Sequence, residues 1–126
     1  MRYVTGYYIG DSEAAIVTVV DELENYYELL GCSTIEAPSI TVDGYDFDVI
    51  CDEEALCRGE TPRCTVGVRI ESGTCRRLIH GPCFVVKADE EGNWCSPTSD
   101  ELMSLELALA RDSEGKPILI AEGPSW

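Results

Sequence analysis

Apolar residues recur along this chain at two spacings, and each spacing predicts a different element. Within Asp21–Leu30 they stand three or four positions apart, the period of an α-helix with one buried face. Thr18 and Asp21 are spaced like a helix start box, and Gly31 supplies a residue that adopts the left-handed conformation of a helix end. The expected buried stripe consists of Leu23, Tyr26, Tyr27 and Leu30.

The period changes to two after this helix, as in strands with one buried face. In Tyr45–Cys51 every second residue is apolar, whereas Asp46 and Asp48 point to the opposite face. Val42-Asp43-Gly44 carries an Asp-Gly turn signal and joins this strand to an expected partner at Thr34–Thr41. Further strands are expected at Tyr3–Ile9, Ile16–Val20, Cys64–Ile70, Arg76–Ile79, Cys83–Ala88 and Pro117–Ala121, with turns at Gly73, Gly81 and Gly92.

A second helix is expected near residues 98–110. Thr98 and Glu101 have the spacing of a capping box, and Leu102, Leu105 and Leu109 supply the buried stripe before an end at Arg111. The length of 126 residues and an apolar content of 44% suit one domain with a proper core. We therefore predict a single α+β domain over residues 1–126, with a mostly antiparallel sheet packed against two helices.

Charge divides the chain into an acidic body and a basic middle. Twenty-four Asp and Glu against nine Lys and Arg give a net charge of −15. Residues 1–57 hold thirteen acids and one base, whereas residues 58–87 hold six bases and two acids. A negative field repels DNA, RNA and anionic lipid and attracts basic surfaces. We therefore expect a basic protein surface as the partner, such as that of a host nucleic-acid-binding protein, without direct contact to nucleic acid.

The apolar stretch Ala14–Val20 is the membrane candidate, but seven residues fall far short of a span. The chain does not open with the basic and apolar regions of a signal peptide. We therefore expect a cytoplasmic protein without membrane contact.

Two charged clusters are candidate binding surfaces. The acidic one is the expected partner-binding surface: Asp43, Asp46, Asp48, Asp52, Glu53 and Glu54. Residues two apart on a strand face the same way about 6.6–6.8 Å apart, so Asp46 and Asp48 are candidates to replace successive phosphates. The simpler interpretation is an edge strand that charge protects from pairing with other sheets.

The basic cluster is the expected anion-binding patch: Arg58, Arg63, Arg76 and Arg77. Its simpler role is pairing with carboxylates of the same fold or of a second subunit, which leaves a homo-oligomer open.

Seven cysteines, without any CxxC motif, are expected to be reduced and to serve mostly as small buried hydrophobes. Cys75, His80 and Cys83, with Cys64 or Cys95, have zinc-ligand chemistry but come from separate strands rather than from closely spaced pairs. We expect no metal and no cofactor. His80 is expected to be a hydrogen-bonded turn residue.

Cys57 and Arg63 have the C-x5-R spacing of phosphatase loops. The glycine comes one place early, however, and Glu60 would place a carboxylate beside the phosphate. We expect no catalytic residues.

Several segments together resemble a known family. They are the helix Asp21–Leu30, Val49–Glu54, Gly81–Val86, Asp89–Gly92 and the helix start Ser99–Glu101. In this order, over about Val17 to Ala110, they are similar to small domains of unknown function encoded largely by phages, plasmids and conjugative elements of gut bacteria. Ala55 stands where that family usually has a glycine, and Thr61–Cys64 only approximates its Pro-Asn-Arg element. The resemblance implies a mobile genetic element as the setting.

These observations predict a non-enzymatic, acidic interaction protein of a mobile genetic element. In its sharpest form it is an anti-restriction or anti-CRISPR type of inhibitor that mimics nucleic acid. One alternative is a structural or regulatory homo-oligomeric protein of the element. Another is a small cysteine-dependent or zinc-dependent enzyme.

Overall fold

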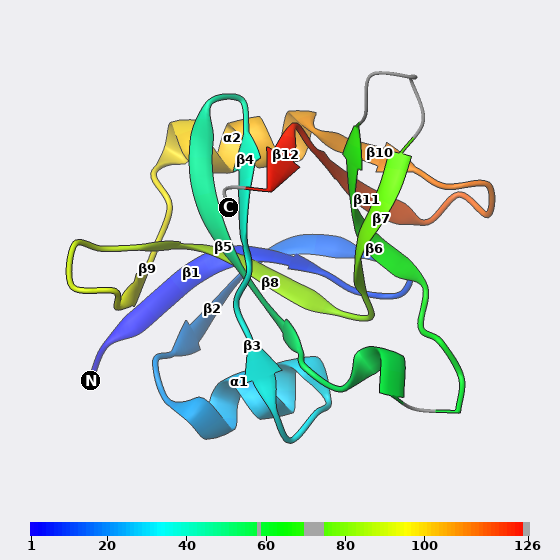
Figure 1. The fold of residues 1–126 in the computed structure, drawn as a ribbon. Helices are drawn as coiled ribbons and strands as arrows, with labels where there is room; N and C mark the ends of the chain where they lie inside the picture. Colours follow the sequence, from blue (N-terminus) through cyan, green and yellow to red (C-terminus); the bar gives the residue numbers. More distant parts are fainter. Residues whose placement is uncertain (58, 70–74, 125–126) are drawn as a thin grey trace.

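The computed structural model describes residues 1–57, 59–69 and 75–124. Its strands form two sheets, and the two helices lie at opposite ends of the molecule (Figure 1). The larger sheet has the order β12-β4-β5-β8-β1-β2, with the short β3 beside β5 and β9 beside β8. Its members are β1 (Tyr3–Ile9), β2 (Ala14–Val20), β3 (Ile35–Glu36), β4 (Ser39–Val42), β5 (Tyr45–Asp52), β8 (Cys83–Ala88), β9 (Trp94–Cys95) and β12 (Gly123–Pro124).

The smaller sheet has the order β10-β11-β6-β7. Its strands are β10 (Leu109–Arg111), β11 (Pro117–Ala121), β6 (Cys64–Arg69) and β7 (Cys75–His80). The β11–β6 pair is parallel, and the other described pairs are antiparallel. The helices are α1 (Leu23–Leu30) and α2 (Ser99–Leu107), with a 3-10 turn at Ala55–Cys57. The predicted α+β fold with a mostly antiparallel sheet is confirmed.

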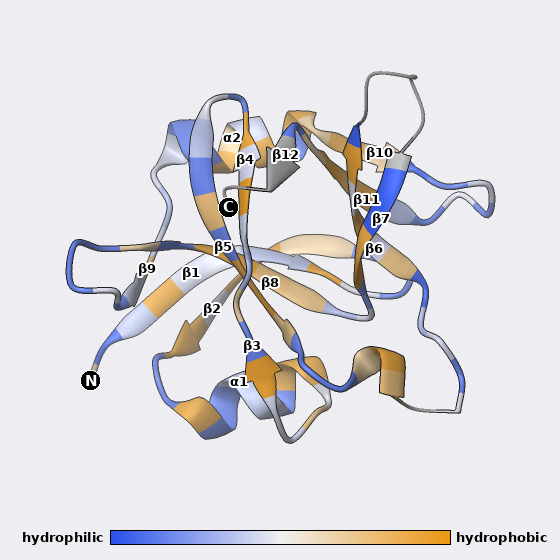
Figure 2. Ribbon diagram, viewed as in Figure 1, coloured by the Kyte–Doolittle hydropathy of each residue, from blue (hydrophilic) through white to orange (hydrophobic). Residues whose placement is uncertain are grey.

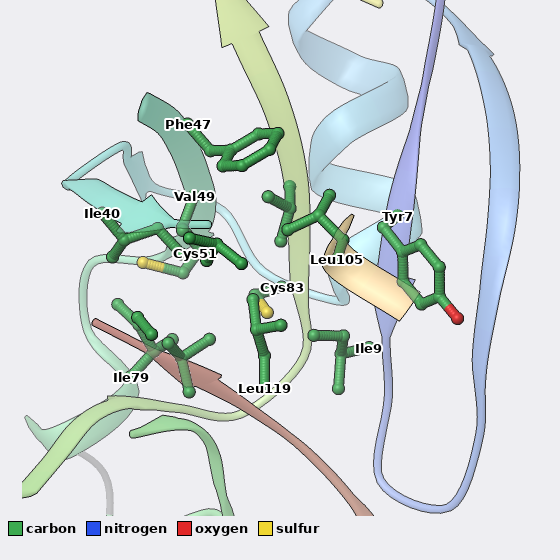
Figure 3. Packing of buried hydrophobic residues seen from close by; sticks show 14 of the residues in the cluster. Tyr7, Ile9, Ile40, Phe47, Val49, Cys51, Ile79, Cys83, Leu105 and Leu119 are labelled. Atoms are coloured by element: carbon green, nitrogen blue, oxygen red, sulfur yellow. The ribbon is translucent and has the colours of Figure 1, made fainter. Parts of the chain in front are cut away.

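Both faces of the larger sheet are buried at its centre. One face and the smaller sheet enclose a cluster that includes Phe47, Val49 and Leu105 of α2 (Figure 3). The other face packs with α1 in a second cluster, which contains Ile50 and Phe84. Neighbouring residues of β5 and β8 are therefore buried on opposite faces, as expected for central strands covered on both sides.

Strands β1 and β11 have the predicted bounds. The predicted Asp43-Gly44 turn and the predicted capping box of Thr98 and Glu101 are also confirmed. Asp43 and Gly44 have φ of 52° and 80°, so both central turn residues are left-handed, as a two-residue hairpin requires. The capping box forms in both directions. The Thr98 N–H donates to Glu101 Oε1 at 2.8 Å, and the Glu101 N–H donates to Thr98 Oγ1 at 3.2 Å.

The predicted start of the first helix is two residues too early, and the predicted end of the second helix is three residues too late. The N-cap position of the first helix is Glu22, whose side chain makes no cap hydrogen bond. The predicted box of Thr18 and Asp21 does not form, because Thr18 lies in β2 opposite Thr5 of β1. Leu23 is 50% exposed and is not part of the buried stripe, since the side chains that α1 buries are Tyr26 and Leu30.

The second helix ends at Leu107 rather than near residue 110. The next three residues form β10, because β11 provides an antiparallel partner from Leu109 onward and Ile120 donates to the Ala108 carbonyl at 3.1 Å. The predicted strand Thr34–Thr41 is likewise two strands, β3 and β4. They are separated at Pro38, whose nitrogen carries no hydrogen to donate to a ladder. Predicted features at Ile70 and Gly73 lie outside the described residues.

Gly6 allows β1 to cross β8 closely. A Cβ atom at this position would lie 2.6 Å from the Val85 carbonyl oxygen, 2.8 Å from Val86 Cγ1 and 2.9 Å from Phe84 Cζ. All three distances are shorter than real Cβ contacts, and one neighbour is backbone that cannot rotate away. The missing side chain at Gly6 therefore lets β1 lie close to β8, next to Phe84 and Val86 of the cluster that packs with α1.

We therefore expect Gly6→Ala to lower the free energy of unfolding by about 3 kcal/mol, the upper end of the usual cost of overpacking. Urea denaturation of the purified protein measures this. Gly59→Ala is the matched control, because an added Cβ there meets no atom within 4 Å. An unchanged urea midpoint for Gly6→Ala would show that the two strands can separate without cost.

Candidate functional site

The outer face of the β4–β5 hairpin carries an ordered pair of carboxylates. The register places Ser39 opposite Asp48 and Thr41 opposite Asp46. Ser39 Oγ donates to Asp48 Oδ1 at 3.0 Å, and Thr41 Oγ1 donates to Asp46 Oδ1 at 2.8 Å. We call these four residues the carboxylate ladder. The inner residues Ile40, Val42, Phe47 and Val49 are buried, so strand alternation directs the ladder to the other face. Figure 2 shows hydrophilic and hydrophobic positions alternating along β5.

Hydrogen bonds and an ion pair connect the hairpin turn and the β5 backbone beside the ladder to α2. Asp43 Oδ2 accepts a hydrogen bond from Ser104 Oγ at 2.8 Å. Lys87 Nζ lies 2.9 Å from Glu101 Oε2, donates to the Asp46 carbonyl at 2.6 Å and stands 5.2 Å from the centre of the Phe47 ring. Burial acts to raise the pKa of Glu101, but hydrogen bonds from Thr98 and Lys87 outweigh it and hold the pKa below its usual value. The cation nearest this face is therefore engaged with a carboxylate of α2.

The structure does not bring the other three predicted acids to the ladder. Asp52 ends β5 six residues beyond Asp46, which corresponds to about 20 Å of extended strand. Its side chain is buried, at 7% exposure, and its Oδ1 accepts the Glu54 N–H at 2.9 Å in the turn that follows. Glu53 and Glu54 are exposed at that same far end. Asp52 therefore has a local structural role, and the ordered acidic surface consists of Asp43, Asp46 and Asp48.

Arg63, a predicted anion ligand, is engaged inside the protein. Its guanidinium donates to the Gly10 and Pro117 carbonyls, each at 2.6 Å, and to the Cys64 carbonyl at 3.2 Å. It also lies 3.4 Å from Asp112 and 3.8 Å from Asp11. We call these contacts the Arg63 clamp. They match the simpler of the two roles predicted for the basic cluster, which was pairing within the fold.

Of the remaining predicted arginines, Arg77 lines the same cavity as Arg63, and its side chain is exposed on β7. Arg76 is also exposed on β7, and Arg58 lies outside the described residues. The guanidinium of Arg63, the arginine of the C-x5-R spacing, is occupied by these contacts within the fold.

A cavity of about 560 Å³ lies beside the clamp. His80 Nδ1 is 3.0 Å from the Pro62 carbonyl oxygen, which fixes its ring and agrees with the predicted hydrogen-bonded role. Cys64 Sγ donates to the Val66 carbonyl at 3.2 Å, and burial raises the pKa of its thiol. Asp112 accepts the backbone N–H of Glu114 and of Lys116, each at 2.9 Å, and the Lys116 bond is the main cause of its lowered pKa. The polar groups of this cavity therefore maintain turns and strand ends.

The described cysteines are in the thiol form: Cys32, Cys51, Cys57, Cys64, Cys83 and Cys95. Cys51 and Cys83 are opposite positions in the register of β5 and β8, and both are buried in the core (Figure 3). Burial raises the pKa of both thiols, that of Cys83 to about 12. Among the described residues, no three His, Cys, Asp or Glu side chains are placed to hold a metal ion. The side chain of Cys75, a predicted zinc ligand, lies outside the described part of the structure.

The comparison with protein families agrees with the ordered segments of the sequence. A model of a domain of unknown function, DUF3846, matches residues 4–109. The chain belongs to the DUF3846 family. The match includes β1, so the family domain begins earlier than the expected Val17. Neither a curated protein nor a solved structure matches the chain.

In the DUF3846 domain, as far as it is described, neither helix has the length and apolar content to cross a membrane. The partners of the two ladder carboxylates, Ser39 and Thr41, were not anticipated from the sequence. The signal for them was present, because an Asp43-Gly44 turn fixes the register of the hairpin. The clamp has no such local signal, since Arg63 binds residues 53 and 54 positions away.

We expect Arg63→Lys to lower the free energy of unfolding by about 2–3 kcal/mol, because one ammonium cannot replace a guanidinium that reaches several carbonyls. Urea denaturation measures the loss. Arg76→Lys changes an exposed arginine in the same way, and we expect it to stay within about 0.5 kcal/mol of the parent. Equal losses for the two variants would contradict the clamp.

We also expect the thiols to differ in alkylation rate. At pH 8, iodoacetamide should modify exposed Cys57 much faster than Cys51 and Cys83, since the thiolate is the reactive form and burial disfavours it. Peptide mapping after timed quenching measures the rates. In denaturant without reductant all seven cysteines should titrate as thiols. Uniform labelling of the folded protein would mean that the core around β5 and β8 opens readily.

Proposed function

We propose that this DUF3846 protein is a non-enzymatic interaction protein that binds a basic protein surface through its carboxylate ladder. The observation that carries the proposal is the pair of cross-strand hydroxyl–carboxylate bonds, Ser39 to Asp48 and Thr41 to Asp46. They hold two negative groups on one strand face before a partner arrives. Binding then costs less side-chain entropy than it would with freely rotating carboxylates.

The net charge of −15 acts together with this local order. A strongly negative protein and a cationic surface attract each other over several ångströms, and the attraction raises the association rate and falls with added salt. The ladder supplies the contact itself. Carboxylates two residues apart on a strand lie about 6.6–6.8 Å from each other, which supports a partner that normally holds successive phosphates.

In its specific form, the proposal is a decoy that occupies the nucleic-acid-binding surface of a host protein. An anti-restriction or anti-CRISPR type of inhibitor encoded by a mobile genetic element fits the size, the charge and the sequence resemblance. The decoy repels nucleic acid and competes with it for the same basic partner.

We expect the double variant Asp46→Asn, Asp48→Asn to lose this partner while it remains folded, because an amide oxygen still accepts from Ser39 and Thr41 but carries no charge. Affinity capture from a bacterial lysate with quantitative mass spectrometry compares the parent with the variant. The relevant proteins are those that the parent enriches and that added double-stranded DNA displaces.

The control variant is Glu90→Gln, Glu91→Gln, which removes the same charge from the exposed loop after β8. It should retain the partner. If both double variants lose binding equally, net charge rather than the ladder is responsible. If the ladder variant binds as the parent does at low salt, the carboxylates have no role in recognition.

A further inference from the structure

Among the described strands, β2 is an edge of the larger sheet, at the end away from β4 and the carboxylate ladder. Its seven residues pair with β1 without a bulge, from Tyr3 opposite Val20 to Ile9 opposite Ala14. The Asp21 N–H donates to the Arg2 carbonyl and the Gly10 N–H to the Glu13 carbonyl, each at 2.8 Å. Hydrogen-bonded pairs alternate along an antiparallel ladder. The backbone N–H and C=O of residues 14, 16 and 18 therefore point away from β1.

This edge lacks the features that usually block strand addition. The sequence of β2 is AAIVTVV, without a charge, a proline or an interruption of its register. Ile16 is 54% exposed on it. In contrast, β7, at the edge of the smaller sheet, carries the exposed Arg76 and Arg77, and β12 is only two residues long.

A groove of about 350 Å³ runs between this edge and α1. Its lining comes from the end of β2 and one side of the helix: Thr18, Val19, Val20, Asn25, Glu28 and Leu29. Asn25 Nδ2 donates to the Val20 carbonyl at 3.2 Å and closes the groove at that end. A strand added to β2 would place every second side chain in this groove, against Val19 and Leu29. Glu28, on the helix side of the groove, would lie beside these side chains.

Charge distinguishes between two occupants of the edge. In the register that pairs all of β2 with β2 of a second copy, Glu13 would face Asp21 of that copy, whose charge Arg2 partly neutralises at 3.6 Å. The main factor against a second copy is therefore the net charge of −15 on each molecule. A basic peptide instead meets Glu13 and Glu28, which are both exposed. We propose that β2 and α1 form a site for an extended peptide segment of a partner, with alternating apolar residues flanked by Lys or Arg, that adds as a strand to the sheet.

The test uses an N-acetylated, C-amidated peptide of sequence KVTVTVK and the 15N-labelled full chain. We expect saturating peptide to slow amide hydrogen exchange at Ile16 and Thr18 at least tenfold, because their N–H groups become paired. The amides of Val17 and Val19, which already face β1, should change little. Peptides EVTVTVE and KVTPTVK should bind at least tenfold more weakly.

Variants connect the binding to the edge and the groove. Ile16→Lys places a charge on an exposed edge position and should abolish peptide binding. Glu28→Gln should weaken it about threefold, as for loss of one exposed charge pair. Glu24→Gln, on the same helix but outside the groove lining, should not change it. The ladder variant Asp46→Asn, Asp48→Asn should bind the peptide normally, so the two proposals can fail separately.

Two outcomes would overturn the inference. One is unchanged exchange at Ile16 and Thr18 with millimolar KVTVTVK. The other is slow exchange at these amides without peptide that appears only as protein concentration rises, together with a dimer in sedimentation velocity, which would make a second copy the occupant.

Discussion

The Arg63 clamp is the contact that the arrangement of the two sheets depends on. One guanidinium joins the end of β1, through the Gly10 carbonyl, to the start of β11, through the Pro117 carbonyl. β1 belongs to the larger sheet and β11 to the smaller one, so the clamp closes the end of the core between them. It also neutralises part of the charge of Asp11 and Asp112 where two turns approach. A chain with fifteen surplus negative charges needs a cation at this position, because carboxylates that converge without one repel each other.

The position of the carboxylate ladder follows from how the larger sheet is covered. One face of β5 packs under the smaller sheet along most of its length, so Phe47, Val49 and Cys51 are all buried there. The other face is covered by α1, an eight-residue helix about 12 Å long, whereas eight residues of strand extend about 26 Å. The helix reaches Ile50 but does not cover the hairpin. Beyond the helix, Asp46 is exposed and Asp48 is half-buried, and the hydroxyls of Thr41 and Ser39 on β4 order their carboxylates.

Most features encoded within a few residues were predictable from the sequence, apart from the start box of Thr18 and Asp21, and features that depend on distant partners were not. The bounds of β1 and β11, the Asp43-Gly44 turn and the capping box of Thr98 all come from local signals. Leu109 was predicted to be helical because it continues the apolar period of α2. It lies in a strand instead, because residues 109–111 pair with β11. Asp52 looked like part of an acidic surface because its neighbours are acidic, but pairing with Ile35 of β3 buries it. Likewise, Arg63 was placed among anion ligands by charge alone, because its carbonyl partners lie far along the chain.

The strong acidity and the open β2 edge have a common explanation. An uncharged, uninterrupted strand at a sheet edge is ordinarily a liability, since a second copy can pair with it. Here the net charge of −15 on each molecule opposes the approach of a second copy, and Glu13 adds an exposed carboxylate at the start of β2. The same charges attract a basic chain. An acidic body therefore protects the edge from self-association while it leaves the edge accessible to a cationic partner, so the edge strand itself needs no lysine, proline or bulge.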